Sequence, residues 1–456
     1  MNSSSLTRYA PGSLREITAI SLPLMLSILS GTLMLVIDRI VLARYSLDAM
    51  NSAAAAGVLF ALFQFGTIGV AAITQVFVGQ YNGGGEKRLA GSAAWQMVWF
   101  GLLSALLAWP LAFYALPLLL ASHHYELSSP YLFWLFLFAP FFPATAALSS
   151  FFVGLGKVRY VVMVTLVSNL LNGLFDYLLI FGIEGYIPSM GTAGAAIATG
   201  IAQFVQLVVF LAIFLRKRYR QEYGTHQWRY KSHLFWSMMA KGVPNSLAHM
   251  IEIAAHAITF RLAAEAGDGY LTLMTVGQTI LIMIIFITEG ISKALSSLVA
   301  NFIGAGQNHL VGRSRRSALL LLFLLSLPLS VPMLFFPQLL ITPFLADPES
   351  LQQFGPLLES SCRWLWLFFL IDGIGWICNA LLTAVGDTFF IMMGNAINTW
   401  LFCLLPLSLL MVVFQGSPFY YWPIVCGYGA TNALLYGWRY QSGRWKQLQP
   451  LLPASS

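Results

Sequence analysis

Charged residues are scarce in this 456-residue chain: Asp, Glu, Lys and Arg make up 9% of it, against about 25% in an ordinary soluble domain. Hydrophobic residues make up 58%. A soluble fold of this composition would expose far more apolar surface to water than such folds tolerate. The scarcity of charge therefore excludes a soluble enzyme, a nucleic-acid-binding protein and a disordered protein. It predicts an all-α polytopic membrane protein.

Cysteine is also scarce, and long polar segments are missing. The four cysteines all lie within apolar runs, at Cys362, Cys378, Cys403 and Cys426. Cysteines in such runs are usually small packing residues, so we expect neither a disulfide nor a metal centre from them. The apolar run that follows Arg15 is too long for a signal-peptide core, and we expect it to be retained as the first membrane span.

Twelve apolar runs fill most of the sequence, and each is long enough to cross a bilayer as a helix. They fall near residues 15–38, 50–79, 91–118, 128–152, 160–183, 192–215, 238–263, 271–302, 314–341, 355–382, 389–414 and 419–438. Backbone polar groups must be satisfied internally within lipid, and we therefore expect each run to be a transmembrane helix.

The distribution of basic residues gives the expected orientation. If the N-terminus is cytoplasmic and the spans alternate, nineteen of the 24 Lys and Arg residues lie on cytoplasmic segments and four on the opposite side. The positive-inside rule then favours twelve spans with both termini in the cytoplasm. Short loops favour a bacterial inner membrane, and we expect a monomer whose partners are membrane lipid and a small-molecule substrate.

Matching segments indicate that the chain is internally duplicated. The matches are Pro23 with Pro244, the turns 83–85 with 304–306, and the Asn-x-x-Asn segments 169–172 with 395–398. The first two matches share an offset of 221 residues. We expect an N-terminal six-helix lobe over 1–215, a cytoplasmic basic linker over 216–237, a C-terminal six-helix lobe over 238–440 and a cytoplasmic tail over 441–456. Two lobes of equal orientation would enclose a central cavity.

An ordered set of short motifs resembles the multidrug and toxic compound extrusion (MATE) family of secondary transporters. The motifs are Leu22-Pro23 with Val36-Ile37-Asp38, the glycine turns already named, Ser168-Asn169-Leu170-Leu171-Asn172 with Asp176-Tyr177, Gly194-Ala195-Ala196-Ile197-Ala198-Thr199, Gly242-Val243-Pro244 with Glu252, and Asp372 with Gly386-Asp387-Thr388. The resemblance implies a V-shaped pair of six-helix lobes. It also implies export of bulky, often cationic organic compounds in exchange for Na⁺ or H⁺, with neither enzymatic activity nor a cofactor other than the coupling ion.

Acids within the spans of the first half are candidates for ion coupling, because ionisable groups in lipid are costly and usually functional. Asn172 and Asp176 share one face of the fifth span, and Asp38 ends the first. The resemblance implies a proton-linked role for Asp38, Asn172, Asp176 and Thr199. Two alternatives stay open: Asp38 could pair with Arg39 at the lipid head groups, and the asparagines could simply satisfy Asp176.

The second half carries Glu252 in the seventh span and Asp372 in the tenth. The resemblance assigns cation coordination to these two positions. Hard cations such as Na⁺ prefer oxygen ligands. Phe368, one turn before Asp372, offers none, whereas a tyrosine can occupy this position in relatives. This difference favours H⁺ over Na⁺.

Histidines and a second charged pair accompany these acids. His249 and His256 share a face of the seventh span with Glu252, and they could tune its proton, bind a transition metal or simply pack. Glu289 and Lys293 stand four residues apart in the eighth span, in the favourable order for a helical ion pair. The pair either neutralises itself or exchanges partners, for instance when Lys293 meets Glu252 or Asp372. Such a lysine favours proton coupling or a substrate that carries negative charge.

The leading hypothesis is a twelve-span antiporter that exports bulky cationic or amphipathic organic compounds in exchange for H⁺ or Na⁺, with H⁺ favoured. Pro23 and Pro244 are candidate bends in the first and seventh spans. The alternative within the same superfamily is a flippase or exporter of a lipid-linked or anionic metabolite. An intramembrane enzyme would need a catalytic or metal constellation, and only the face of His249, Glu252 and His256 resembles one.

Overall fold

The computed structural model describes residues 6–119, 125–345, 348–448 and 451, and helices dominate these residues. The first half contains α1 (Leu14–Tyr45), α2 (Leu47–Ala71), α3 (Thr74–Gly83), α4 (Lys87–Leu103), α5 (Ala105–Pro110), the π-helical turn η1 (Leu111–Ala115), α6 (Leu116–Leu119), α7 (Tyr125–Phe138), α8 (Phe141–Gly154), α9 (Val158–Phe181) and α10 (Gly191–Phe214). In the order of the chain these helices form six long segments. They correspond to the six runs expected for the N-terminal lobe.

The second half repeats this plan after a short helix, α11 (Lys217–Tyr223). It contains α12 (Ser232–Ala266), α13 (Asp268–Gly304), α14 (His309–Ser330), η3 (Val331–Phe335), α15 (Gln338–Ile341), α16 (Pro348–Ala384), α17 (Thr388–Asn398), η4 (Thr399–Leu404), α18 (Leu405–Ser408), η5 (Leu409–Val413), η6 (Pro418–Tyr420), α19 (Tyr421–Gln441) and η7 (Arg444–Gln447). Pro23 lies inside α1 and Pro244 inside α12, and each helix continues through its proline.

Most of these segments are long and apolar enough to cross a membrane. Within the described residues nine helical segments meet that test, and the pair α7 and α8, bent by 45° at the break between them, makes a tenth. α12 and α19 span 35 and 21 residues and complete the twelve expected segments. α12 begins at Ser232, six residues before the expected lobe boundary. Part of the expected tail, residues 449–450 and 452–456, lies outside the described residues.

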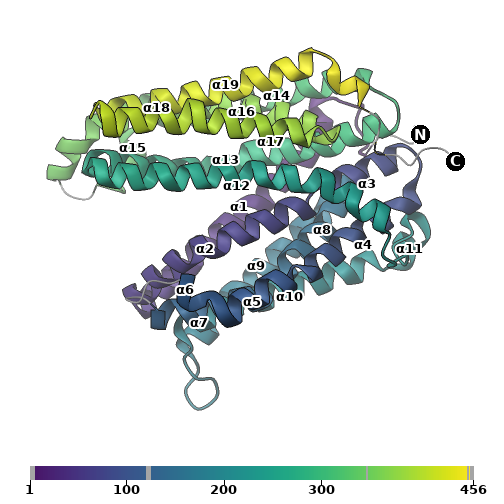
Figure 1. Ribbon diagram of the computed structural model, residues 1–456, viewed down its shortest axis with the longest axis horizontal. Coiled ribbons are helices and arrows are strands. Elements are labelled where there is room, and N and C mark those ends of the chain that lie inside the picture. Colours follow the sequence, from purple (N-terminus) through teal and green to yellow (C-terminus); the bar gives the residue numbers. More distant parts are fainter. Residues whose placement is uncertain (1–5, 120–124, 346–347, 449–450, 452–456) are drawn as a thin grey trace.

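The two halves form two helical bundles that meet at one end of the molecule and diverge toward the other (Figure 1). α1 and α3 of the first bundle pack against α13 of the second, and α2 packs against α12. Both termini lie at the end where the bundles meet, which we call the junction end. The arrangement is the V-shaped pair of lobes that the family resemblance implied.

Two helix ends related by the internal repeat bring the backbones of the two lobes into close contact. A Cβ atom on Gly83 of α3 would collide with the carbonyl oxygen of Asn301, and one on Gly304 of α13 would collide with that of Gln80. Gln80 Nε2 donates to the carbonyl oxygen of Ala384 at 2.8 Å, and Asn301 Nδ2 donates to that of Gly154 at 2.9 Å. The offset of 221 residues relates Gln80 to Asn301 and Gly83 to Gly304, so the duplicated sequence builds a duplicated contact.

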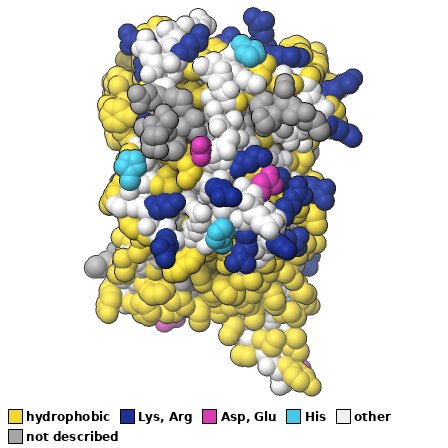
Figure 2. All heavy atoms as spheres, turned by 90° about the vertical axis from the view of Figure 1, so that its right-hand side faces the viewer, with side chains coloured by type: hydrophobic (Ala, Val, Ile, Leu, Met, Phe, Trp, Pro, Cys, Tyr) yellow, Lys and Arg dark blue, Asp and Glu magenta, His cyan; other side chains and the backbone are white. Residues whose placement is uncertain are grey.

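Basic side chains gather on the face at the junction end (Figure 2). The linker contributes to this face and is tied to the first bundle, because Trp95 and Trp99 of α4 donate to linker carbonyls at 2.7 Å each. Lys157, in the turn before α9, lies 4.5 Å from the ring centroid of Tyr219 and 4.9 Å from that of Tyr223. Burial lowers the pKa of Lys157 to about 8. The linker therefore forms a folded layer on the N-terminal lobe.

Candidate functional site

The acids of the N-terminal lobe meet at Asn172. Its Nδ2 donates to Asp38 Oδ1 at 3.2 Å and to Asp176 Oδ2 at 2.5 Å. The two carboxyls, which come from α1 and α9, are also within hydrogen-bonding range of each other. Asn172 and Asp176 are fully buried. The structure therefore brings three of the four predicted N-lobe residues into one cluster.

This cluster has more acceptors than donors. Within the described residues, Asp176 Oδ1 and Asn172 Oδ1 are buried without a hydrogen-bond partner. A buried acceptor without a partner costs about 1–3 kcal/mol, and two adjacent carboxylates repel each other. A proton on one carboxyl supplies the missing donor and removes the repulsion. The cluster can therefore hold a proton or another small cation.

The predicted residue Thr199 hydrogen-bonds elsewhere, whereas Tyr131, which was not predicted, lies near the acids. The hydroxyl of Thr199 donates to the carbonyl oxygen of Ala195 in its own helix at 3.0 Å, and among the described residues it makes no hydrogen bond to the acids. Tyr131 of α7 lies close enough to Asp38 and Asp176 to interact with both electrostatically. No sequence motif singled out this tyrosine. The contact of Asp38 with Asn172 favours the interior cluster over an ion pair with Arg39.

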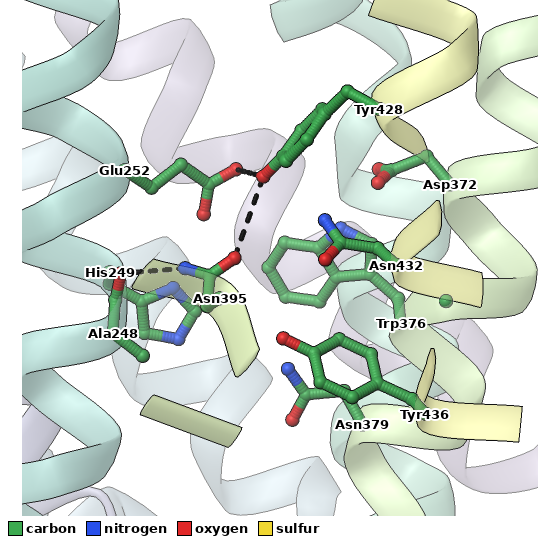
Figure 3. Close-up of a pocket in the computed structure, with 11 residues that line it drawn as sticks. Ala248, His249, Glu252, Asp372, Trp376, Asn379, Asn395, Tyr428, Asn432 and Tyr436 are labelled. Atoms are coloured by element: carbon green, nitrogen blue, oxygen red, sulfur yellow. Dashed lines mark hydrogen bonds between the residues drawn. The ribbon is translucent and has the colours of Figure 1, made fainter. Parts of the chain in front are cut away.

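The acids of the C-terminal lobe line one small cavity (Figure 3). Its volume is about 30 Å³. Its polar lining comes from α12, α16, α17 and α19 and includes His249, Glu252, Asp372, Asn379, Asn395, Tyr428 and Asn432. A cavity needs about 10–15 Å³ to hold one water molecule. This one therefore suits a small cation or a few water molecules and excludes a bulky organic compound.

Tyr428 lies at the centre of the hydrogen bonds in this cavity. Its hydroxyl lies 3.5 Å from Glu252 Oε1, 3.5 Å from Asn395 Oδ1 and 3.3 Å from Thr399 Oγ1. Asn395 is held in turn by the carbonyl oxygen of Ala248 at 2.7 Å. Figure 3 shows Glu252 and Asp372 on opposite sides of the tyrosine, and their charges interact.

Tyr428 also supplies the oxygen that Phe368 lacks. Phe368 packs against Trp422, with ring centroids 6.5 Å apart, and it does not line the cavity. The cavity nevertheless presents carboxylate, amide and hydroxyl oxygens, which are the ligands that hard cations prefer. The sequence argument against Na⁺ therefore loses its basis, and the geometry accommodates either ion.

The two histidines of α12 are placed differently. His249 lines the cavity and stacks on Trp376, with ring centroids 5.9 Å apart and planes 24° apart. His256 is partly exposed and is not among the lining residues. No group of three or more His, Cys, Asp or Glu side chains that could hold a metal ion occurs in the described parts of the chain.

Glu289 and Lys293 form the ion pair that their spacing predicts, with Lys293 Nζ 2.6 Å from Glu289 Oε1. Glu289 also interacts electrostatically with His249, which connects the pair to the edge of the cavity. Lys293 is paired with Glu289 rather than with Glu252 or Asp372 in this structure.

Sequence reasoning missed Tyr428, Asn395 and Trp376 as site residues. The repeat offered a signal for one of them, because the segment 395–398 matches 169–172, which contains Asn172. Nothing comparable marked Tyr428, which is 176 residues from the Glu252 that it contacts.

Clustered acids within the spans of two helical bundles are typical of a multi-pass membrane transporter. The family model described as MatE matches residues 23–178 and 244–410, one segment in each lobe. The chain belongs to this family, as its motifs suggested.

Relatives and solved structures agree with this assignment. The chain is 24% identical over 405 residues to a protein of Thermotoga maritima described as a probable multidrug resistance protein NorM, which covers 87% of this chain and 85% of the relative. It is 26% identical over 260 residues to multidrug and toxin extrusion protein 1 of Xenopus tropicalis, covering 56% and 44%. It is 27% identical over 201 residues to an FAD transporter of Shewanella oneidensis, covering 43% of each chain.

Two solved structures share the fold at 18% sequence identity, each covering 98% of this chain and 99% of the other. One is an outward-facing multidrug resistance MATE family transporter of the MOP superfamily, with a TM-score of 0.84. The other is a MOP superfamily transporter from Pyrococcus furiosus, with a TM-score of 0.82. They confirm the predicted fold class.

Proposed function

We propose that this protein is an antiporter that exports bulky cationic or amphipathic organic compounds in exchange for a small cation, with H⁺ favoured over Na⁺. The observation that carries the proposal is the cavity between Glu252 and Asp372, which is too small for an organic compound and is lined by cation-binding oxygens. Relatives described as multidrug resistance proteins support the substrate class.

Cation binding offers a route to coupling. Glu252 lies on α12 and Asp372 on α16, so neutralising their mutual repulsion favours a closer approach of these helices. α12 packs directly against α2 of the other lobe. A change in the position of α12 therefore alters the contact between the lobes. Exchange results when the ion stabilises one arrangement of the lobes and the organic compound stabilises the other.

The orientation follows from charge. The basic junction end would face the cytoplasm of a bacterial inner membrane, with both termini on that side. The lobes meet at this end and diverge at the opposite one, which corresponds to an outward-facing arrangement of a monomeric transporter. H⁺ is favoured because the adjacent carboxyls of Asp38 and Asp176 can share a proton without a coordination shell.

The test is export of ethidium from proteoliposomes with pH and Na⁺ gradients imposed separately. We expect a pH gradient to drive export, and we expect Glu252→Gln and Asp372→Asn to reduce the rate at least tenfold. Glu265→Gln, at an exposed acid that pairs with Arg261, is the matched control. Export driven by Na⁺ alone would reverse the ion preference, and absence of export under both gradients would overturn the proposal.

The second candidate function is export of an anionic or lipid-linked metabolite. Lys293 within a span favours it, and one relative is described as an FAD transporter. Counterflow of radiolabelled FAD in the same proteoliposomes separates the two functions, because a transporter restricted to cationic compounds such as ethidium does not transport FAD.

A further inference from the structure

The Glu289–Lys293 pair occupies a defined face of α13. Gly290 approaches α1 so closely that a Cβ atom there would meet Met25, and Ser292 Oγ donates to a carbonyl of α16 at 3.3 Å. Successive residues of an α-helix are rotated by about 100°. Glu289 and Lys293 therefore point between α1 and α16, on the face where Glu289 interacts with His249 of α12.

This face lies where α13 contacts helices of the N-terminal lobe. Gln75 Nε2 of α3 donates to the carbonyl oxygen of Lys293 at 2.7 Å, so a helix of the N-terminal lobe holds this turn of α13 in place. Both side chains remain accessible, with 45% of Lys293 and 32% of Glu289 exposed. Charged groups within spans avoid lipid. Because the pair is exposed and its face of α13 is turned toward the other lobe, a transported compound can reach it from the space between the lobes.

Lys293 retains hydrogen-bonding capacity toward that space. An ammonium group has three N–H donors, and Glu289 is the side-chain partner that the described residues give it. A second acceptor can therefore bind without breaking the pair. A singly charged group fits better than a dianion, because the Glu289 carboxylate repels additional negative charge.

We propose that Lys293 binds a carboxylate on the transported compound, and that the paired carboxylate of Glu289 weakens this binding by charge repulsion. The proposal rests on the proposed export function and names a chemical class of substrate: amphipathic or zwitterionic compounds with one carboxylate. Neutralising Glu289 frees the ammonium and strengthens carboxylate binding. Removing Lys293 weakens it, and the double variant behaves like the lysine variant alone.

The experiment compares two dyes that differ at one group: rhodamine 6G, an ester, and rhodamine 19, the corresponding free acid. Fluorescence anisotropy with purified full-length protein in lipid nanodiscs gives the Kd of each. We expect Lys293→Met to weaken rhodamine 19 at least tenfold while the Kd of rhodamine 6G changes less than threefold. We expect Glu289→Gln to tighten rhodamine 19 at least threefold, and Lys293→Arg to retain its binding. Lys217→Met, at an exposed lysine of α11, is the charge-matched control.

Equal effects of Lys293→Met on both dyes, no effect on either, or failure of the wild type to bind rhodamine 19 would overturn the proposal. If Lys293→Met does not fold, the Glu289→Gln and Lys293→Arg variants decide it. Binding is measured without an ion gradient. Failure of gradient-driven export of rhodamine 6G would therefore count against the proposed function, and these binding results would remain specific to Lys293.

Discussion

Asn172 holds the two N-lobe carboxyls with a single amide group. Its Nδ2 has two hydrogens, and the structure directs one toward Asp38 and one toward Asp176. The acids therefore stay adjacent, although their charges would otherwise separate them. Asp176 is fully buried and Asp38 is partly accessible. The pair therefore combines a buried carboxyl with one that can exchange protons with the space between the lobes.

This geometry makes Asp176 the residue whose removal should change pH dependence. In Asp176→Asn a carboxyl is replaced by an amide of nearly the same shape, which cannot take up or release a proton at physiological pH. We expect the initial rate of ethidium export to fall at least tenfold and its variation between pH 6 and 8 to flatten. Glu184→Gln, at an exposed acid in the turn after α9, should leave both unchanged. A variant with the wild-type rate and pH profile would contradict a proton-linked role.

At the scale of elements, α3 and α13 approach each other closely because each helix places a glycine against the backbone of the other. Gly83 and Gly304 each face a carbonyl group of the other helix, and the amides of Gln80 and Asn301 reach past the crossing to α16 and α8. Small residues allow such close backbone approach in membrane proteins. The contact ties the ends of four helices together at the junction end.

Adding one methyl group at this crossing should therefore weaken the contact between lobes. In Gly83→Ala or Gly304→Ala the new Cβ meets backbone rather than a movable side chain, and overpacking of this kind costs about 1–3 kcal/mol. We expect a lower melting temperature in differential scanning fluorimetry for each variant. Gly427→Ala, in α19 where no atom lies within 4 Å of the added carbon, is the control. Equal melting temperatures for all three variants would contradict this view of the crossing.

At the scale of the whole molecule, the hydrogen bonds between lobes concentrate at the junction end. Asn82 Nδ2 donates to Asn301 Oδ1 at 2.6 Å, and Ser297 Oγ donates to the carbonyl oxygen of Val153 at 2.6 Å. An exporter must open to each side of the membrane in turn. These bonds would have to break whenever the cytoplasmic side opens.

A covalent link across the junction should therefore stop transport. We expect a double-cysteine variant at Asn82 and Asn301, treated with a short cleavable bis-thiosulfonate, to lose ethidium export and to regain it on reduction. The four native cysteines are buried and unpaired, and they are first replaced by alanine. Cysteines at Lys87 and Glu222, whose side chains lie 3.2 Å apart between the N-terminal lobe and the linker that packs on it, provide the control and should not affect export. Full export by the linked 82–301 protein would show that the lobes need not separate there.

The sequence by itself determined the number and order of the helical segments, the division into two lobes and the face that carries the basic residues. The helical segments are local properties, because each apolar run must satisfy its own backbone within lipid and hydropathy alone therefore specifies a helix. The division into lobes was readable because the sequence is duplicated. The spacing of Asn172 and Asp176, and of Glu289 and Lys293, was also readable because both members of each pair lie on one helix.

Only the tertiary structure decided which helices bring their polar groups together. Tyr428 reaches Glu252 from another helix, Thr199 turns to its own backbone, and Lys293 lies at the junction of the lobes. Each of these outcomes depends on how far a helix is rotated about its axis and on which neighbour it packs against. For Tyr428 and Lys293 the deciding contacts join residues more than one hundred positions apart in the sequence, and no local pattern encodes them.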